Sequence, residues 1–138
     1  RWYGTYLVTG NTGWKDYLLT FKARAQDNDG FGAVFRFKDP QHFYRILFIE
    51  DGMNGGPLTR IDKRDGGDFY ELWSVRRGYQ TGAEMHVLIE AVGDNLTVSV
   101  NGDQLCSVRD GSYLQGKIGL FCFAQAGQAF DDVKVVLK

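Results

Sequence analysis

The stretch DNDGFGAVFRFKDPQHFYRILF, residues 27–48, decides the fold. It contains the run 31–38 and most of the run 43–50, both rich in aromatic and β-branched residues. In each run, residues suited to a buried face alternate with residues suited to the opposite face. Such residues favour strands, and a period of two is that of a strand with one buried face. Asp39-Pro40-Gln41-His42 lies between the runs, where proline suits a tight turn. The stretch therefore predicts an antiparallel hairpin.

Short alternating runs continue on both sides of this hairpin. Turn sequences such as Asn101-Gly102, Asp65-Gly66-Gly67 and Gly93-Asp94-Asn95 separate them, and Asn and Gly accept the positive φ of hairpin turns. No apolar stripe of helical period has a useful length, and the connections are too short for parallel crossovers. The sequence predicts an all-β, two-sheet antiparallel β-sandwich. The further strands are expected over 17–25, 58–63, 69–75, 84–92, 95–101, 104–108, 117–124 and 130–137.

Counting outward from the first turn pairs Lys38 with Phe43 and Arg36 with Arg45. Because side chains alternate between the two faces of a strand, both arginines then point to one face of the sheet. Two like charges directly opposite each other repel, so solvent, a carboxylate or a ligand must separate them. The opposite face is apolar and is expected to face the core, with Phe35, Phe37, Tyr44, Ile46 and Phe48.

A second hairpin, closed by a four-residue loop over 64–67, pairs Arg60 with Glu71 and Leu58 with Trp73. Arg60, Glu71 and Trp73 then lie on the solvent-facing side of the sheet together with the two arginines of the first hairpin. A slip of one residue would exchange the faces. The residues expected to face inward are Thr59, Ile61, Tyr70 and Leu72.

This surface of Arg36, Arg45, Arg60, Glu71 and Trp73 has two interpretations of equal weight. Guanidinium groups and carboxylates hold hydroxyl-rich ligands, and an aromatic ring covers the apolar face of a sugar, so the set suits a carbohydrate site. Alternatively, the charged members form a solvated lattice of ion pairs that needs no ligand, and Trp73 packs under a loop.

Composition limits the classes of function. The chain has 138 residues, 43% hydrophobic and 24% charged, which is the size and composition of one globular domain. A formal net charge of -1 provides no field that would attract nucleic acid or an anionic membrane, so neither is expected as a partner. Because the sequence begins at Arg1, almost directly on strand-like residues, we expect a single domain over 1–138 excised from a larger protein.

Two cysteines, Cys106 and Cys122, are too few for a disulfide scaffold and lack the spacing of a zinc site. A single bridge and two separate buried thiols both remain open, with the thiols favoured.

A calcium site is a further candidate, because Asp27 and Asp29 lie in one tight turn and Asp131 begins the last strand. Clustered carboxylates and carbonyls are the ligands that Ca²⁺ prefers. An ordinary turn and a loop cap explain the same residues, and turns of this composition far outnumber metal sites.

Several motifs together resemble a laminin-G-like or concanavalin A-like jelly-roll domain. Within that group the pattern is most similar to the fructan-binding carbohydrate-binding modules of levanases and to keto-disaccharide hydrolase-type domains. The resemblance covers nearly the whole chain from Trp14 onward. Its motifs are Trp14-Lys15-Asp16-Tyr17, the stretch 27–48 quoted above, TRIDKRDGG, NGDQL, GKIGLFCF and FDDVKV.

The resemblance implies a two-sheet sandwich that binds a polysaccharide or oligosaccharide, acts outside the cell or at the surface of a bacterium, and is covalently linked to neighbouring domains. Related sandwiches often hold structural calcium near the start of the last strand. The arginines of FRF and FYRI are Arg36 and Arg45, which the resemblance places on the face that these modules use for sugar.

The residues favour binding over catalysis. Glycoside hydrolysis needs two facing carboxylates, which sandwich glucanases commonly place in an ExDxE strand, and the sequence has no such strand. A minority hypothesis, taken from the hydrolase resemblance, makes Glu50, Asp51 or Glu71 an acid or base. Another alternative is a laminin-G-type adhesion domain whose ligand is a protein. His42 and His86 are expected to be structural.

Overall fold

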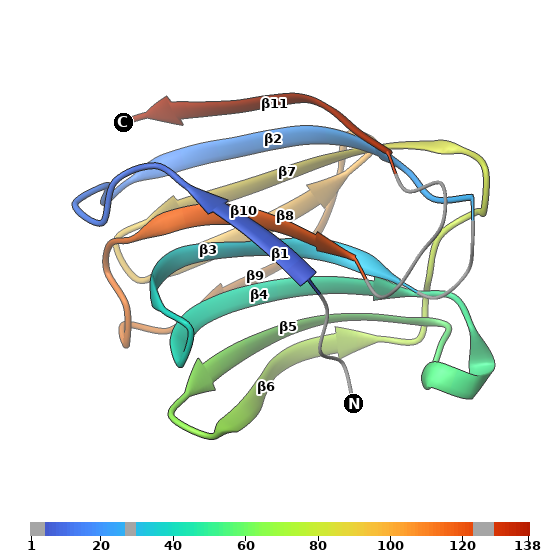
Figure 1. Ribbon diagram of the computed structural model, residues 1–138, viewed down its shortest axis with the longest axis horizontal. Coiled ribbons are helices and arrows are strands. Elements are labelled where there is room, and N and C mark those ends of the chain that lie inside the picture. Colours follow the sequence, from blue (N-terminus) through green and yellow to red (C-terminus); the bar gives the residue numbers. More distant parts are fainter. Residues whose placement is uncertain (1–4, 27–29, 123–128) are drawn as a thin grey trace.

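The computed structural model describes residues 5–26, 30–122 and 129–138, which form two packed antiparallel sheets (Figure 1). All ten predicted strands are present, and residues 5–9 add one more. The six-stranded sheet has the order β1 (Thr5–Thr9), β10 (Lys117–Cys122), β3 (Phe31–Asp39), β4 (His42–Ile49), β5 (Leu58–Asp65) and β6 (Asp68–Val75). The five-stranded sheet has the order β11 (Ala129–Leu137), β2 (Tyr17–Arg24), β7 (Glu84–Val92), β8 (Asn95–Val100) and β9 (Asp103–Arg109).

The predicted turns form two-residue hairpin connections. Asn101-Gly102 joins β8 to β9 with φ values of 52° and 87°, the left-handed geometry that matches the twist of paired strands. Gly66-Gly67 joins β5 to β6, and Gly93-Asp94 joins β7 to β8. These turns explain why consecutive strands are neighbours in each sheet.

The main core lies between the sheets. Strand β2 contributes every second residue to it, and these side chains are at most 2% exposed. The six-stranded sheet also carries buried apolar residues on its other face, which we call the outer face. This outer cluster comprises Val34, Phe37, Phe43, Leu47, Ile49, Leu58 and Phe121.

The first hairpin departs from the predicted register at Arg36. Asp39 pairs with His42 as the turn requires, but a bulge in β3 places Val34, not Arg36, opposite Arg45. Arg36 has φ of 45°, which non-glycine residues seldom adopt, and this reverses the alternation of faces. Phe37 therefore lies on the outer face, and its predicted place in the core is wrong.

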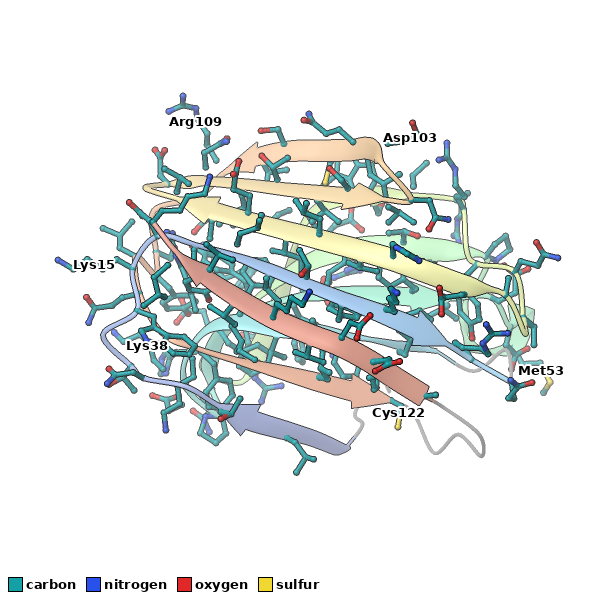
Figure 2. All side chains as sticks on the ribbon, turned by 90° about the horizontal axis from the view of Figure 1, so that it is seen from above. Lys15, Lys38, Met53, Asp103, Arg109 and Cys122 are labelled. Carbon is teal, nitrogen blue, oxygen red and sulfur yellow. The ribbon has the colours of Figure 1, made fainter. Side chains whose placement is uncertain are left out.

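Arg36 is fully buried and joins the two sheets at one end of the sandwich, so its predicted exposure is also wrong. Its Nη2 donates to the carbonyl of Lys15 at 3.0 Å, and its Nη1 donates to the carbonyls of Gly93 and of Tyr113, the latter at 3.2 Å. Lys15 precedes β2, and Gly93 lies in the β7–β8 turn. Lys15 and Lys38 mark this end in Figure 2. One guanidinium thus satisfies carbonyls from three separate connections.

The crossing from β9 back to β10 is held at the same end by Asp110. Its Oδ1 accepts a hydrogen bond from the Tyr44 hydroxyl at 2.6 Å, and its Oδ2 lies 3.0 Å from Lys63 Nζ. Burial would raise the pKa of Asp110, but hydrogen bonds from Tyr44, the Ser112 backbone and Lys63 outweigh it and lower the pKa to about 2.

Strand β11, at the edge of the five-stranded sheet, is irregular. Its pairing with β2 shifts register between Asp131 and Lys134, where Asp132 has φ of 51°. Asp132 forms an ion pair with Lys22 at 2.9 Å.

Both cysteines are free, as the thiol interpretation predicts. Cys106 lies in β9 and Cys122 in β10, in different sheets. Burial raises the pKa of Cys106 to about 11, so its thiol stays protonated and unreactive at neutral pH.

Replacing Arg36 by Met should lower the free energy of unfolding by about 3–5 kcal/mol, because several buried carbonyls lose their donor together. Urea unfolding would measure the change. Arg109→Met is the matched control, because its side chain is 78% exposed, and it should cost less than about 0.5 kcal/mol. Equal stability of the two variants would contradict the assigned role of Arg36.

Acid should remove the contribution of Asp110. Its pKa is lower in the folded protein than the ordinary 3.8, so this contribution is complete above about pH 4 and is lost as the pH falls toward about 2. Between these values the wild type should lose about 1–2 kcal/mol more stability than Asp110→Asn, after allowance for solvent screening. Urea unfolding of the wild type and of Asp110→Asn across this pH range would test the prediction. An equal loss of stability in the two proteins would refute it.

Candidate functional site

Three of the five residues predicted for the site lie together on the outer face of β4, β5 and β6. They are Arg45, Arg60 and Glu71, and they are joined by Asp62, which the sequence analysis left out of the site. Asp62 follows Arg60 by two residues in β5, so strand alternation places it on the same face. The two-residue spacing of Arg60 and Asp62 is therefore the feature of the sequence that could have placed Asp62 in the site.

The four residues form a continuous chain of ion pairs. Arg45 Nη2 lies 2.5 Å from Asp62 Oδ2, Arg60 Nε donates to Asp62 Oδ1, and Arg60 Nη1 lies 3.4 Å from Glu71 Oε1. Arg45 and Asp62 face each other directly across the β4–β5 pairing. The predicted opposition of Arg36 and Arg45 does not occur, and the Asp62 carboxylate offsets the repulsion between Arg45 and Arg60.

Exposure divides this chain into a buried part and an open part. The side chains of Asp62 and Arg45 are 0% and 5% exposed, whereas those of Arg60 and Glu71 are 18% and 50% exposed. Burial lowers the pKa of Arg45, which the charge of Asp62 opposes, and arginine remains charged. The predicted exposure of Arg45 to solvent is therefore wrong, because Asp62 compensates its charge within the sheet surface. The buried pair fixes the position of Arg60.

The aromatic ring of this face is Phe69, not Trp73. The Arg45 guanidinium carbon lies 3.9 Å from the centroid of the Phe69 ring, and that of Arg64 lies 4.7 Å from it. Both distances are within the range of a cation–π interaction. Both guanidinium groups thus pack against the half-buried Phe69 ring beside the ion-pair chain.

The prediction that Trp73 lies on this face is wrong. The β5–β6 turn has two residues, not four, so Asp62 pairs with Glu71. A bulge then shifts the register, and Trp73 stands opposite Ile61 and packs against the core between the sheets. The predicted strand pairing of Arg60 with Glu71 is likewise wrong, although their side chains do meet.

The residues proposed for calcium are divided. Asp27 and Asp29 lie outside the described residues, and Asp131 is exposed in β11, where its Oδ1 accepts from the backbone N–H of Asp132 at 2.8 Å. No group of three or more potential metal-binding side chains occurs among the residues that the structure describes. Calcium binding stays a prediction.

The carboxylates considered for catalysis have structural contacts. Glu50 Oε1 accepts from the backbone N–H of Tyr79 at 3.1 Å, and Asp51 caps the short 3₁₀ helix Gly52–Asn54 by accepting from the Met53 N–H.

Within the described ranges no helix has the length and apolar character needed to cross a membrane.

Solved structures with the same architecture include sugar-binding proteins. The carbohydrate-binding module CBM66 from Bacillus subtilis superposes with a TM-score of 0.78 at 16% identity, covering 96% of this chain and 91% of that chain. Xenopus laevis galectin-Ib superposes with a TM-score of 0.74 at 15% identity, covering 97% of this chain and 100% of that chain. A toad ovary galectin in complex with thio-digalactose superposes with a TM-score of 0.69 at 18% identity, covering 96% of this chain and 98% of that chain.

The fold is a concanavalin A-like jelly roll. At these identities the likeness establishes the fold, as the sequence predicted, and leaves the ligand to the residues of this chain. No protein-family profile matches the sequence, and a comparison with curated protein sequences found no match.

The buried Arg45–Asp62 pair should behave as a unit. Asp62→Leu alone leaves two guanidinium groups without their shared carboxylate and should cost about 3–5 kcal/mol. Adding Arg45→Met should recover part of this loss, because an apolar pair replaces the buried charge. Urea unfolding of the wild type, both single variants and the double variant would measure the coupling. A double variant less stable than Asp62→Leu would show that the pair is not coupled as described.

Proposed function

We propose that this chain is a non-catalytic carbohydrate-binding module that holds a polysaccharide or oligosaccharide on the outer face of β4–β6. The observation that carries the proposal is the set of oriented donors, acceptors and an aromatic ring on one sheet face. Arg60 and Arg64 offer planar donors, Glu71 offers an acceptor, and the Phe69 ring packs against the Arg64 guanidinium and supports it. Vicinal hydroxyls need such paired donors and acceptors.

Pre-orientation supports this assignment. Arg60 is held by Asp62 and Glu71 before any ligand arrives, so less side-chain entropy is lost on binding. The structural neighbours include a carbohydrate-binding module and a galectin in complex with thio-digalactose, which supports the same ligand class. We propose that the module acts outside the cell or at its surface and anchors covalently linked neighbouring domains to the polysaccharide. Linkage supplies avidity that one small site lacks.

The test is retention in native gels that contain levan, a β-glucan or an acidic polysaccharide, with calorimetry against thio-digalactose as a fourth ligand. The wild type should be retained by at least one of the four without release of reducing sugar. Arg60→Ala should weaken that binding about tenfold or more, because it removes a charge-assisted donor. Glu71→Gln should have a smaller effect in the same direction, since an amide still accepts.

Arg109→Ala is the matched control, because this exposed arginine lies in β9 of the other sheet. It should leave retention unchanged. Equal retention of the Arg60 and Arg109 variants would exclude the proposed face, and release of reducing sugar would favour the hydrolase alternative. A blank panel would contradict sugar binding and favour the adhesion alternative.

A further inference from the structure

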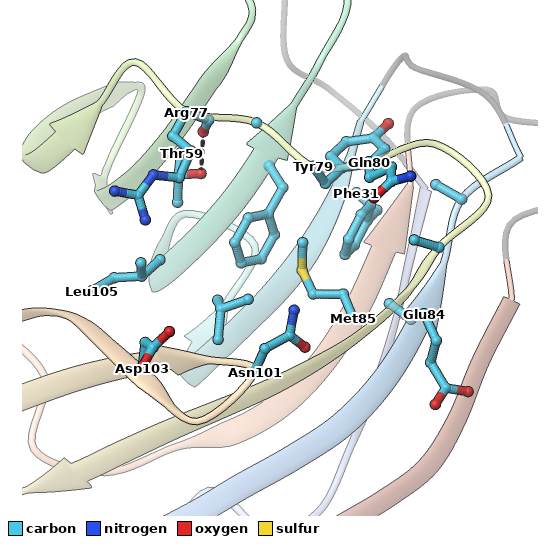
Figure 3. A pocket seen from close by; sticks show the side chains of 16 residues that line it. Phe31, Thr59, Arg77, Tyr79, Gln80, Glu84, Met85, Asn101, Asp103 and Leu105 are labelled. Carbon is cyan, nitrogen blue, oxygen red and sulfur yellow. Dashed lines mark hydrogen bonds between the residues drawn. The ribbon is translucent and has the colours of Figure 1, made fainter.

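The end of the sandwich opposite Arg36 contains a cleft between the two sheets (Figure 3). Its volume is about 290 Å³, close to the lower limit for small-molecule pockets. Residues from both sheets line it, including Ala23 of β2, Phe31 of β3, Phe48 of β4 and Met85 of β7. It shares no lining residue with the ion-pair chain on the outer face.

The cleft exists because the inward side chains of β2 become smaller toward the end of the strand. Its inward residues are Tyr17, Leu19 and Phe21 and then Ala23, followed by Ala25 beyond the strand. Protein interiors are normally packed with few voids larger than a water molecule, so two small residues in succession leave space that larger ones would fill. Ala83 continues this lining of small side chains.

The inner part of the cleft is apolar and closely packed. Phe31 and Phe48 are each 1% exposed with ring centroids 5.2 Å apart, and Tyr79 packs edge-on against Phe31 at 5.0 Å. The buried hydroxyl of Thr59 already donates to the Arg77 carbonyl at 2.5 Å. A sugar ring inserted here would bury hydroxyls without partners, which is costly, whereas an apolar ring or short acyl group would not.

The mouth carries a positive charge. The Arg77 backbone is fixed by Thr59 and by its N–H bond to the Val75 carbonyl at 2.9 Å, and the side chain extends over the mouth toward Leu105 (Figure 3). Among the arginines in the described part of the chain, Arg77 has a guanidinium with no hydrogen bond or ion pair to another described residue. Arg76, its neighbour, instead donates to the Gly55 carbonyl at 2.7 Å.

The other polar residues of the rim complement an anion only in part. Asn101 accepts from the His86 N–H through Oδ1, and its amide nitrogen points into the cleft (Figure 3). Glu84 turns away from the cleft and lies 2.9 Å from His86 on the outside of the sheet. Asp103 remains at the mouth as an opposing charge.

From this arrangement we infer a second ligand site, for a small amphipathic carboxylate. Its apolar ring or short acyl body lies between Phe48 and Met85, and its carboxylate pairs with Arg77. Planar guanidinium groups bind carboxylates through two parallel hydrogen bonds, which gives the ligand a fixed orientation. The site does not depend on sugar binding at the outer face.

The experiment is an NMR titration of the ¹⁵N-labelled chain with phenylacetate. Amide signals of Gly78, Tyr79 and Leu105 should shift and saturate, while phenylacetamide, which lacks the charge, should bind about tenfold more weakly. Arg77→Gln should weaken phenylacetate binding about tenfold, and Asp103→Asn should strengthen it. Ala83→Leu should abolish binding by filling the cleft, with the remaining spectrum unchanged.

Arg76→Gln is the matched control and should bind as the wild type does. Arg60→Ala should also bind phenylacetate normally, which separates this site from the proposed sugar site. Absence of saturable shifts would overturn the inference, as would equal binding of phenylacetate and phenylacetamide. Saturable shifts of the same amides by glucose or fructose would show that the cleft takes a sugar instead.

Discussion

The burial of one guanidinium group organises this sandwich. Arg36 can reach carbonyls before β2 and in the β7–β8 turn only because its own backbone takes a left-handed conformation in the middle of a bulge. The bulge in turn moves Phe37 to the outer face, where it stacks on Phe43 with ring centroids 5.4 Å apart. A cation of the six-stranded sheet, satisfied by carbonyls of three connections at this end, thus sets where β3 bends and how the sheets meet there.

The arginines of the central strands consequently have different surroundings. Arg36 donates mainly to backbone carbonyls, with the half-exposed Asp16 carboxylate 3.4 Å from its Nη2, whereas Arg45 lies 2.5 Å from the buried Asp62 carboxylate and 3.9 Å from the centroid of the Phe69 ring. Removing a buried charge from water is costly, and each environment compensates in its own way. Of the two, only the environment of Arg45 includes more exposed neighbours: Arg60 and Glu71 are held in position on a surface that solvent reaches.

Most of the fold was predictable, because apolar alternation and turn sequences such as Asn101-Gly102 act locally. The site was predictable in part: Arg45, Arg60 and Glu71 share a face, as strand alternation requires. Arg36 and Trp73 were misplaced because each lies at or next to a bulge, and neither residue type signals one. Exposure of Arg36 could not be judged from sequence either, since its partners are carbonyls brought together by the fold.

The irregular edge of β11 has a consequence for behaviour at high concentration. An edge strand with unpaired backbone groups can join the same strand of another molecule and begin a continuous intermolecular sheet. The left-handed Asp132 and the register shift before Lys134 bend this edge and place charges along it, so two flat edges cannot align. The bulge thereby disfavours intermolecular pairing along this edge of the five-stranded sheet.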